Sequence, residues 1–224
     1  MKPYGIISDT HLHAWSLFSE QNKDGTNSRL RIILDEISKV AQNVKDAGGD
    51  ELFHLGDCFH VRGNLSPSVL NPTITTFKKI VNDMGMRVVM IAGNHDLETK
   101  DAHSYSNAST ALKAVGVHVI AEDYEIIDKK ILIPWVNSVT DLKSKIEDIA
   151  KDIGDVSEHT LMIHAPVNGV IIGIPDHGLD GKYLQKFGFK HVFSGHYHSF
   201  KEVDKNVYSV GALTHQTWGD VDSV

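Results

Sequence analysis

Polar residues able to bind metal or carry protons follow a short apolar run near the middle of this sequence. The run Arg87 to Ala92 is almost unbroken, which predicts a strand buried on both faces of a sheet. It stops at Gly93 and is followed by Asn94, His95 and Asp96. Asn94 offers a neutral oxygen ligand, His95 a titratable ring, and Asp96 a carboxylate that can orient that ring. A plain polar turn explains this stretch equally well if it is taken alone.

The same arrangement recurs after four other strand-like runs. The polar residues that follow them are Asp9 and His11, then Asp57, then His164, then His196 and His198. In α/β sheets, sites form beyond the carboxyl ends of the strands, where rigid strands aim side chains into a crevice. Two residues that lie two apart at a strand end can point the same way. Five strand ends that supply Asp, Asn or His therefore predict a metal site.

The types of these ligands indicate the chemistry. Carboxylate, amide and imidazole donors without a thiolate cluster suit Mn, Fe, Zn or Mg rather than a Cys-rich structural zinc site. Asp57 has two carboxylate oxygens and can bridge two ions. Two ions about 3.5–4 Å apart can bind phosphate oxygens, lower the pKa of a bridging water and stabilise an in-line displacement. The leaving oxygen then needs a proton, which His95 is placed to give. We expect two divalent ions, with Mn favoured.

Length and composition are those of an ordinary globular protein. The 224 residues are 41% hydrophobic and 23% charged, enough for one large domain with a sizeable core. No apolar stretch approaches the roughly 20 residues that a membrane span needs, and the N-terminus lacks a signal-peptide pattern. The single cysteine, Cys58, cannot form an internal disulfide. We therefore expect a cytoplasmic protein with no membrane partner.

The formal net charge of -7 argues against a protein whose main task is to grip duplex DNA through its phosphates. Two bound divalent cations would add positive charge at one spot. A phosphate can therefore still be drawn to the site itself.

Strands and helices alternate along the chain. Apolar residues at three- and four-residue steps predict a helix over Ser28 to Asp46, capped by Asn27 or Ser28. We expect a second helix with Asn71-Pro72 as its cap and first turn, and a third over Asp101 to Val115. A hairpin is predicted around Asp128-Lys129, followed by a helix that Gly154 ends. These elements predict a single compact α/β domain over residues 1–224, with a mixed two-layer sheet between helices.

Taken in order, the blocks Asp-x-His, Gly-Asp, Gly-Asn-His-Asp, His and Gly-His-x-His resemble the calcineurin-like metallophosphoesterase family over essentially the whole chain. The resemblance implies a four-layer αββα sandwich with a binuclear metal centre. The positions that match the ligands of the first metal are Asp9, His11, Asp57 and His198. Those that match the ligands of the second are Asp57, Asn94, His164 and His196. His95 matches the family's catalytic histidine.

The segment Gly56 to Ser68 is similar to the Mre11/SbcD nuclease branch, in which a histidine follows the bridging aspartate by three residues. That histidine is His60 here, and the resemblance implies that it assists His95. The tail Tyr208 to Asp220 also looks like the corresponding segment of phage recombination nucleases. Those nucleases continue into a DNA-capping domain and a segment that binds a Rad50/SbcC-like ATPase, and no such segment is evident in this sequence. A nucleic acid substrate is expected, while an ATPase partner and a homodimer stay open.

Three functions from different classes fit the sequence. The first is a metal-dependent phosphodiesterase, a DNA nuclease of Mre11/SbcD type. The second is a phosphomonoesterase or nucleotide phosphodiesterase on the same fold. The third is a non-catalytic scaffold, which has no reason to keep a full ligand set together with the catalytic histidine.

A few polar residues lie outside the pattern, and most of them have two interpretations. His13 is either an exposed loop residue or a neighbour of the ligands, and His54 is expected to be a hydrogen-bonded core histidine. Arg62 is either a phosphate contact or a surface arginine. Asp176 and His177, with His215 further on, can shape a substrate pocket or merely face solvent.

Overall fold

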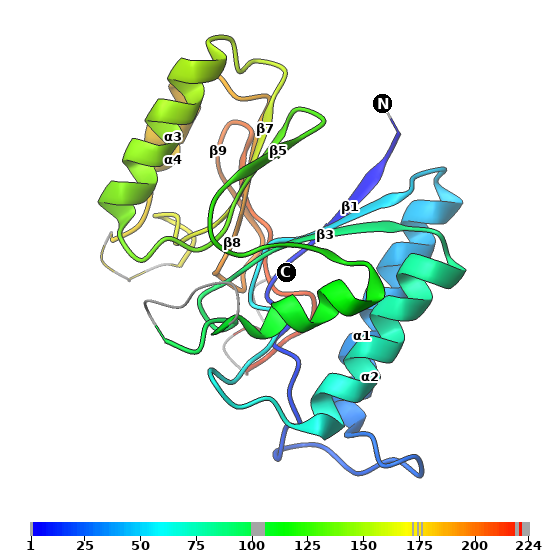
Figure 1. Ribbon diagram of the computed structural model, residues 1–224. Coiled ribbons are helices and arrows are strands. Elements are labelled where there is room, and N and C mark those ends of the chain that lie inside the picture. Colours follow the sequence, from blue (N-terminus) through cyan, green and yellow to red (C-terminus); the bar gives the residue numbers. More distant parts are fainter. Residues whose placement is uncertain are drawn as a thin grey trace.

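Two sheets packed face to face form the centre of the molecule, and helices cover their outer faces (Figure 1). The computed structural model describes residues 2–99, 106–171, 173, 175, 177–217 and 220. The first sheet has the order β1-β2-β3-β4, and all of its strands are parallel. Its strands are β1 (Tyr4–Ile7), β2 (Glu51–His54), β3 (Arg87–Ile91) and β4 (His118–Ile120).

The second sheet is mixed and has the order β5-β6-β7-β8-β10-β9. Its strands are β5 (Glu125–Ile127), β6 (Lys130–Ile133), β7 (Thr160–His164), β8 (His191–Gly195), β9 (Lys201–Asp204) and β10 (Val207–Ser209). The β5–β6 and β9–β10 pairs are antiparallel, and the remaining pairs are parallel. The hairpin predicted at Asp128 and Lys129 is confirmed, and both residues have the positive φ that a tight hairpin turn favours.

The helices divide between the two outer faces. The first sheet is covered by α1 (Ser28–Asp46), α2 (Pro67–Lys78), its π-helical continuation η1 (Lys79–Asp83) and the 3-10 helix η3 (Ala108–Val115). The second sheet is covered by α3 (Val139–Ile153) and α4 (Gly181–Gln185). The predicted four-layer αββα sandwich is confirmed. Among the described residues, no helix has both the length and the apolar character that crossing a membrane requires.

A separate apolar layer fills the space between the sheets. It includes Phe53 and Leu55 from the first sheet region, and Leu132 and Met162 from the second, all fully buried. Because β2, β3, β6 and β7 are buried on both faces, their sequences are apolar runs rather than alternating patterns.

Two of the predicted helices differ from those observed. The helix expected to begin at Asn71-Pro72 begins five residues earlier, at Pro67 after Ser66, so that Pro72 lies inside it. The Ser-Pro pair supplies a first-turn proline in the same way as the Asn-Pro pair, and the earlier one is used. The helix expected over Asp101 to Val115 is a 3-10 helix from Ala108, and residues 101–105 lie outside the described part.

Parallel pairing brings the carboxyl ends of the strands to one edge of the molecule. The pairing continues past β1 and β2, since the Asp9 amide donates to Gly56 O and the His11 amide donates to Asp57 O, each at 3.0 Å. Across the two sheets, the Trp135 amide donates to Ala92 O at 2.8 Å. These bonds hold the polar loops of both sheets against each other.

Candidate metal centre

Polar side chains from four strand ends converge into two groups, each with its ligand atoms within 4.8 Å of one another. One group, called the first group below, contains Asp9, His11 and His198. The other, called the second group, contains Asp57, His164 and His196. Each group combines one carboxylate with two histidines, which is a donor set able to hold a divalent cation.

Asn94 belongs to the second group. Its Oδ1 lies 3.1 Å from Nε2 of His164 and 3.0 Å from Nδ1 of His196. An amide oxygen flanked by two imidazole nitrogens at such distances can share one cation with them. All residues predicted as metal ligands are therefore brought together at this edge of the sheets.

Asp57 lies between the groups. Its Oδ1 is 3.5 Å from His164 Nε2 in the second group, and its Oδ2 is 3.7 Å from His11 Nε2 in the first. The two oxygens of one carboxylate thus face different groups. This is the geometry that a bridging ligand requires.

The first group is joined through two ring nitrogens. Nε2 of His11 and Nε2 of His198 face each other at 3.1 Å, and the nearest Asp9 oxygen is 3.9 Å from the same His11 nitrogen. Asp9 Oδ1 is fully buried and has no hydrogen-bond partner in the described part of the chain. A buried carboxylate oxygen without a partner is costly, and a cation between these atoms would remove that cost.

The backbone at the site is strained. Asp9, His11 and Asp57 have φ angles of 52°, 43° and 54°, and His196 has a φ of 103°. Residues other than glycine adopt this left-handed region rarely, at a cost on the order of 1–3 kcal/mol each. All four residues belong to the first or second group, so this backbone conformation places ligand side chains.

Glycine at two of the strand ends lets the loops approach closely. A Cβ at Gly93 would overlap the amide nitrogen and carboxylate of Asp57. A Cβ at Gly195 would overlap Ser8 Oγ and the carbonyl oxygen of Leu55. A side chain at Gly93 would push apart the loops after β2 and β3, and one at Gly195 would push the two sheets apart.

Neighbouring groups orient two of the histidines. Nδ1 of His164 donates to the carbonyl oxygen of Leu55 at 2.6 Å, so that its Nε2 faces the second group. Nδ1 of His198 lies 3.5 Å from Oδ2 of Asp220, so that its Nε2 faces the first group. A carbonyl or carboxylate on the far ring nitrogen is the usual support of a metal-binding histidine.

The titration behaviour of the ligands also fits cation binding. Burial lowers the pKa of both His11 and His196 to about 3, which keeps these rings neutral, as a metal ligand must be. Burial raises the pKa of Asp9 to about 7. Burial also opposes ionisation of Asp57, but the neighbouring His164 holds its pKa below the ordinary value. In return, and against burial, the Asp57 charge raises the pKa of His164 to about 9. A divalent cation would replace the protons that these buried charges attract.

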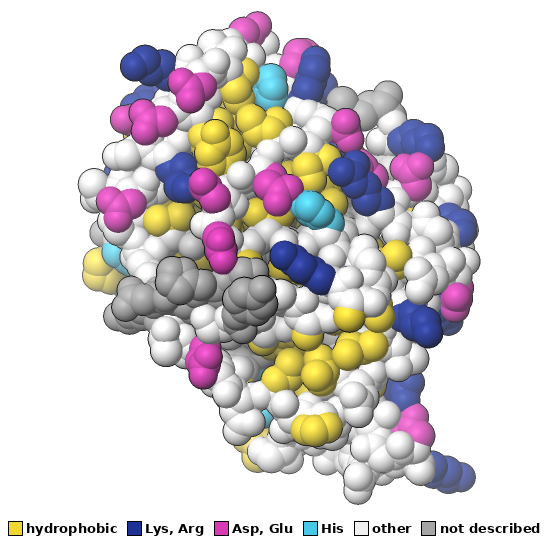
Figure 2. All heavy atoms as spheres, viewed as in Figure 1, with side chains coloured by type: hydrophobic (Ala, Val, Ile, Leu, Met, Phe, Trp, Pro, Cys, Tyr) yellow, Lys and Arg dark blue, Asp and Glu magenta, His cyan; other side chains and the backbone are white. Residues whose placement is uncertain are grey.

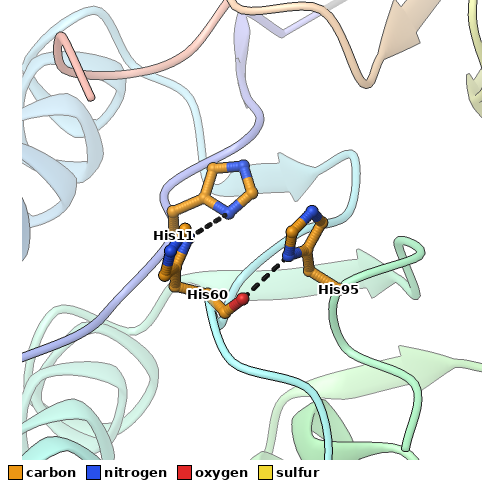
Figure 3. A group of neighbouring side chains, drawn as sticks. All are labelled: His11, His60 and His95. Carbon is orange, nitrogen blue, oxygen red and sulfur yellow. Dashed lines mark hydrogen bonds between the residues drawn. The ribbon is translucent and has the colours of Figure 1, made fainter. Parts of the chain in front are cut away.

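A third cluster of histidines borders the first group (Figure 3). Nδ1 of His95 donates to the carbonyl oxygen of His60 at 2.7 Å, and Nδ1 of His60 lies 3.4 Å from Nδ1 of His11. The His60 and His95 rings are stacked, with centroids 5.7 Å apart. The cluster contains no carboxylate and shares His11 with the first group. It is thus less suited to a hard cation than the other two groups.

Several other residues have clearer positions than the sequence could give. His54 is buried, with Nε2 2.9 Å from Thr10 Oγ1, which confirms a hydrogen-bonded core histidine. His13 is half-buried beside His60, with ring centroids 5.3 Å apart. The idea that Asp96 orients His95 is wrong, because its carboxylate instead accepts the amide hydrogens of Gly93, Cys58 and Phe59. The reason is that the loops after β2 and β3 contact each other here, and their main-chain amides need a hydrogen-bond acceptor.

The remaining candidates lie in loops around the site. Arg62 is exposed and lines a small cavity next to Asn94. His177 is exposed and contacts Tyr197 Oη at 3.2 Å, and His215 is exposed. Asp176 lies outside the described residues.

Three residues that contact the site were missed by sequence reasoning. Trp135 stacks on His196 with ring centroids 5.2 Å apart, Trp15 lies 4.5 Å from the His60 ring centroid, and Asp220 supports His198. None of them follows a strand in a recognisable polar block. Only the aromatic character of the two tryptophans in loop segments could have drawn attention.

The fold and these groups define a class of protein: an αββα sandwich with two carboxylate–histidine groups at its strand ends. The sequence pattern of the calcineurin-like phosphoesterase family matches residues 2–200. The chain therefore belongs to the calcineurin-like phosphoesterase family, and it is a metal-dependent phosphoesterase. No curated protein matches the sequence.

Solved structures of low sequence identity with TM-scores above 0.5 share the fold. One is TT1561 of Thermus thermophilus, at 11% identity and a TM-score of 0.54, covering 94% of this chain and 89% of that one. A dimetal phosphatase from Danio rerio, LOC 393393, has 10% identity and a TM-score of 0.52, covering 94% and 87%. The Pseudomonas putida nuclease MPE has 17% identity and a TM-score of 0.46, covering 95% and 75%.

Proposed function

We propose that this protein is a two-metal phosphodiesterase that cleaves DNA, with Mn²⁺ as the preferred cation. In this proposal the first group and Asp57 hold one cation, and the second group and Asn94 hold the other. The support is the shared position of Asp57 between the groups and the unpartnered Asp9 oxygen. When bound, the two cations supply Lewis-acid stabilisation of the phosphate charge and an activated water as nucleophile.

His95 is the proposed proton donor, and its hydrogen bond to His60 is the observation that carries the proposal. A carbonyl oxygen can only accept, so Nδ1 of His95 must carry the hydrogen in that 2.7 Å bond. When the ring is in its doubly protonated imidazolium form, Nε2 carries the second proton and can deliver it to the leaving oxygen. The main-chain amide of His95 also donates to Asp57 Oδ1 at 2.8 Å, which fixes the ring's distance from the cation ligands.

A proton donor of this kind matters most for a diester of nucleic acid. The leaving group in DNA cleavage is an alkoxide, which leaves poorly unless it is protonated. His60 stacks on His95 and contacts His11, so it can hold the His95 ring in place. This pair supports a nuclease of Mre11/SbcD type more than an enzyme for esters with good leaving groups.

The surface charge is consistent with a protein that binds nucleic acid at the metal centre rather than along its whole surface. The net charge is -7, and acidic and basic side chains are interspersed over the face in Figure 2. A phosphate would therefore be attracted chiefly by the cations themselves. A single-stranded or frayed DNA end, which can enter a crevice, fits this distribution.

The test is an assay in Mn²⁺ that compares single-stranded DNA, duplex DNA, a cyclic nucleotide and a generic phosphomonoester. We expect DNA cleavage, with single strands preferred, and a large loss in His95→Asn. His118→Asn is the matched control, because His118 is exposed at the start of β4, at the opposite end of the strand from the carboxyl ends that form the site. Turnover of the monoester alone would contradict the proposal.

A further inference from the structure

We propose that a cavity beside the second group binds the nucleobase next to the scissile phosphate, with Trp135 as the stacking surface and Arg62 as a contact for the adjoining phosphate. The cavity has a volume of about 180 Å³ and is lined by Arg62, Asn94, Leu97, Thr99, Trp135 and Asn137. The inference rests on the proposed function, because it assigns the class of substrate that the same centre takes.

The cavity and the second group share Asn94. Its Oδ1 lies within 3.1 Å of both His164 and His196 nitrogens. A phosphate held at the cations would thus have its ester substituent at the mouth of this cavity. The volume suits one planar ring and is below the roughly 300 Å³ at which pockets accept drug-sized ligands.

Trp135 is held in a fixed orientation. Its ring stacks on His196 at an interplanar angle of 27°, and its indole N–H donates to Asn137 Oδ1 at 2.8 Å. Its main-chain amide donates to Ala92 O, at the end of β3. A half-buried indole that is fixed on three sides can bind an aromatic ring with little loss of its own conformational freedom. Aromatic side chains stack on any base, so such a surface tolerates different sequences.

Arg62 is the arginine left available at this site. Arg29 lies over the Trp15 ring, and Arg31 and Arg87 pair with carboxylates. Arg62 is exposed and has no acidic partner within ion-pair distance in the described ranges. A guanidinium beside a metal-bound phosphate can form paired hydrogen bonds to a second phosphate. Together the two residues distinguish a nucleotide unit from a simple alkyl phosphate.

The proposal is tested by binding of three probes to the Mn²⁺-loaded protein, measured by isothermal titration calorimetry. Methyl phosphate reports the metal centre alone. Thymidine 5′-monophosphate adds a base, and thymidine 3′,5′-bisphosphate adds a second phosphate without a diester bond that could be cleaved. In the wild type we expect the monophosphate to bind about tenfold tighter than methyl phosphate, a typical effect of one stacked base.

Trp135→Leu should bring that ratio close to one, while methyl phosphate binds as before. Trp135→Phe keeps a ring and should retain most of the preference. Arg62→Ala should reduce the gain from the second phosphate several-fold, whereas Arg31→Ala, the matched control, should not change it. Metal content is measured for each variant, so that any disturbance of His196 is recognised.

Equal affinity of the wild type for methyl phosphate and the nucleotides would overturn the proposal. So would an equal loss for all three probes in Trp135→Leu, since Trp135 would then only support His196. These binding results do not depend on turnover. If the protein fails to cleave DNA, the proposed function is wrong. The nucleotide-binding proposal is still decided by the calorimetry alone.

Discussion

The first and second groups share Asp57 but differ in what surrounds them. The first group borders the imidazole rings of His60 and His95. The second group contacts the Leu55 carbonyl and the Trp135 ring. Similar ligand sets therefore sit in unlike surroundings.

The difference suggests a division of labour across one metal centre. In the proposed mechanism, proton transfer to the leaving group takes place on the side of His60 and His95, where the rings are close and partly open to solvent. The substrate is proposed to bind on the other side, where Trp135 lines a cavity.

Asp57→Ala removes the residue that joins the two sides, and it should have the largest effect. Each group loses a ligand and the shared negative charge, so we expect both cations to be lost and activity to become undetectable. His198→Ala should mainly weaken one cation. Elemental analysis after gel filtration measures this, and an Asp57 variant that keeps two tightly held cations would show that the groups are independent.

His95→Ala should separate catalysis from cation binding on the side of His60 and His95. We expect both cations and the fold to be retained, with turnover of DNA reduced by about 10²–10⁴-fold, the usual size of a general-acid contribution. The loss should be smaller for a nitrophenyl diester, whose leaving group needs little protonation. Steady-state kinetics on both substrates decide the matter, and equal losses on the two would remove His95 from the proton-donor role.

Substitution of His60, which stacks on His95, tests whether the two histidines act together. His60→Ala should cost less than His95→Ala, and the double variant should lose less than the two single effects combined, because residues that act as one unit are not additive. Full additivity would mean that His60 acts on something other than His95.

Asp220→Asn tests the support of the first group from the tail of the chain. Asparagine keeps an oxygen for the amides of Gln216 and Thr217 but loses the charge that faces His198. We expect one cation to bind about 10–100-fold more weakly, the usual effect of such a support, and the other to be unchanged. Mn²⁺ titration monitored by electron paramagnetic resonance resolves the two affinities, and Asp152→Asn on the exposed face of α3 is the control. Equal weakening of both cations would contradict a role on one side.

His54 belongs to neither the first nor the second group, and its substitution should have the smallest effect of those proposed here. Burial lowers its pKa to about 3, from about 6.5 in the unfolded chain. The unfolded state therefore binds the extra proton, so the stabilising contribution is present above pH 6.5 and is lost as pH falls below it. In metal-free protein, His54→Gln should reduce the acid loss of unfolding free energy by roughly 1.4 kcal/mol for each pH unit below 6.5. Urea unfolding at pH 8, 6 and 5 measures this, and parallel pH profiles of variant and wild type would contradict it.

The strand-end residues were predictable because the physics that places them is local. An apolar run predicts a buried strand, and parallel strands bring their carboxyl ends to one edge of their sheet, so Asp9, Asp57 and Asn94 had to lie near one another. Helix α1 was predictable for a similar reason. Its apolar periodicity and its N-cap both depend on residues close in sequence. The cap is Asn27, whose side chain accepts the Leu30 amide hydrogen.

Residues that reach the site through long-range packing could not be predicted. Trp135 meets His196 only because the loop after β6 bonds to the end of β3 in the other sheet. Asp220 meets His198 only because the tail folds back, with the Leu213 amide 3.3 Å from Ser8 O. The start of α2 was missed because two prolines, Pro67 and Pro72, offer equivalent signals.

The central claim is that two cations share Asp57 and that His60 and His95 hold neither. Anomalous diffraction from crystals soaked in Mn²⁺ tests it most directly. The account predicts two peaks about 3.5–4 Å apart, one against His11 and His198 and the other against His164 and His196. A peak held instead by His11, His60 and His95 would contradict it, because the proposed proton donor would then be a metal ligand.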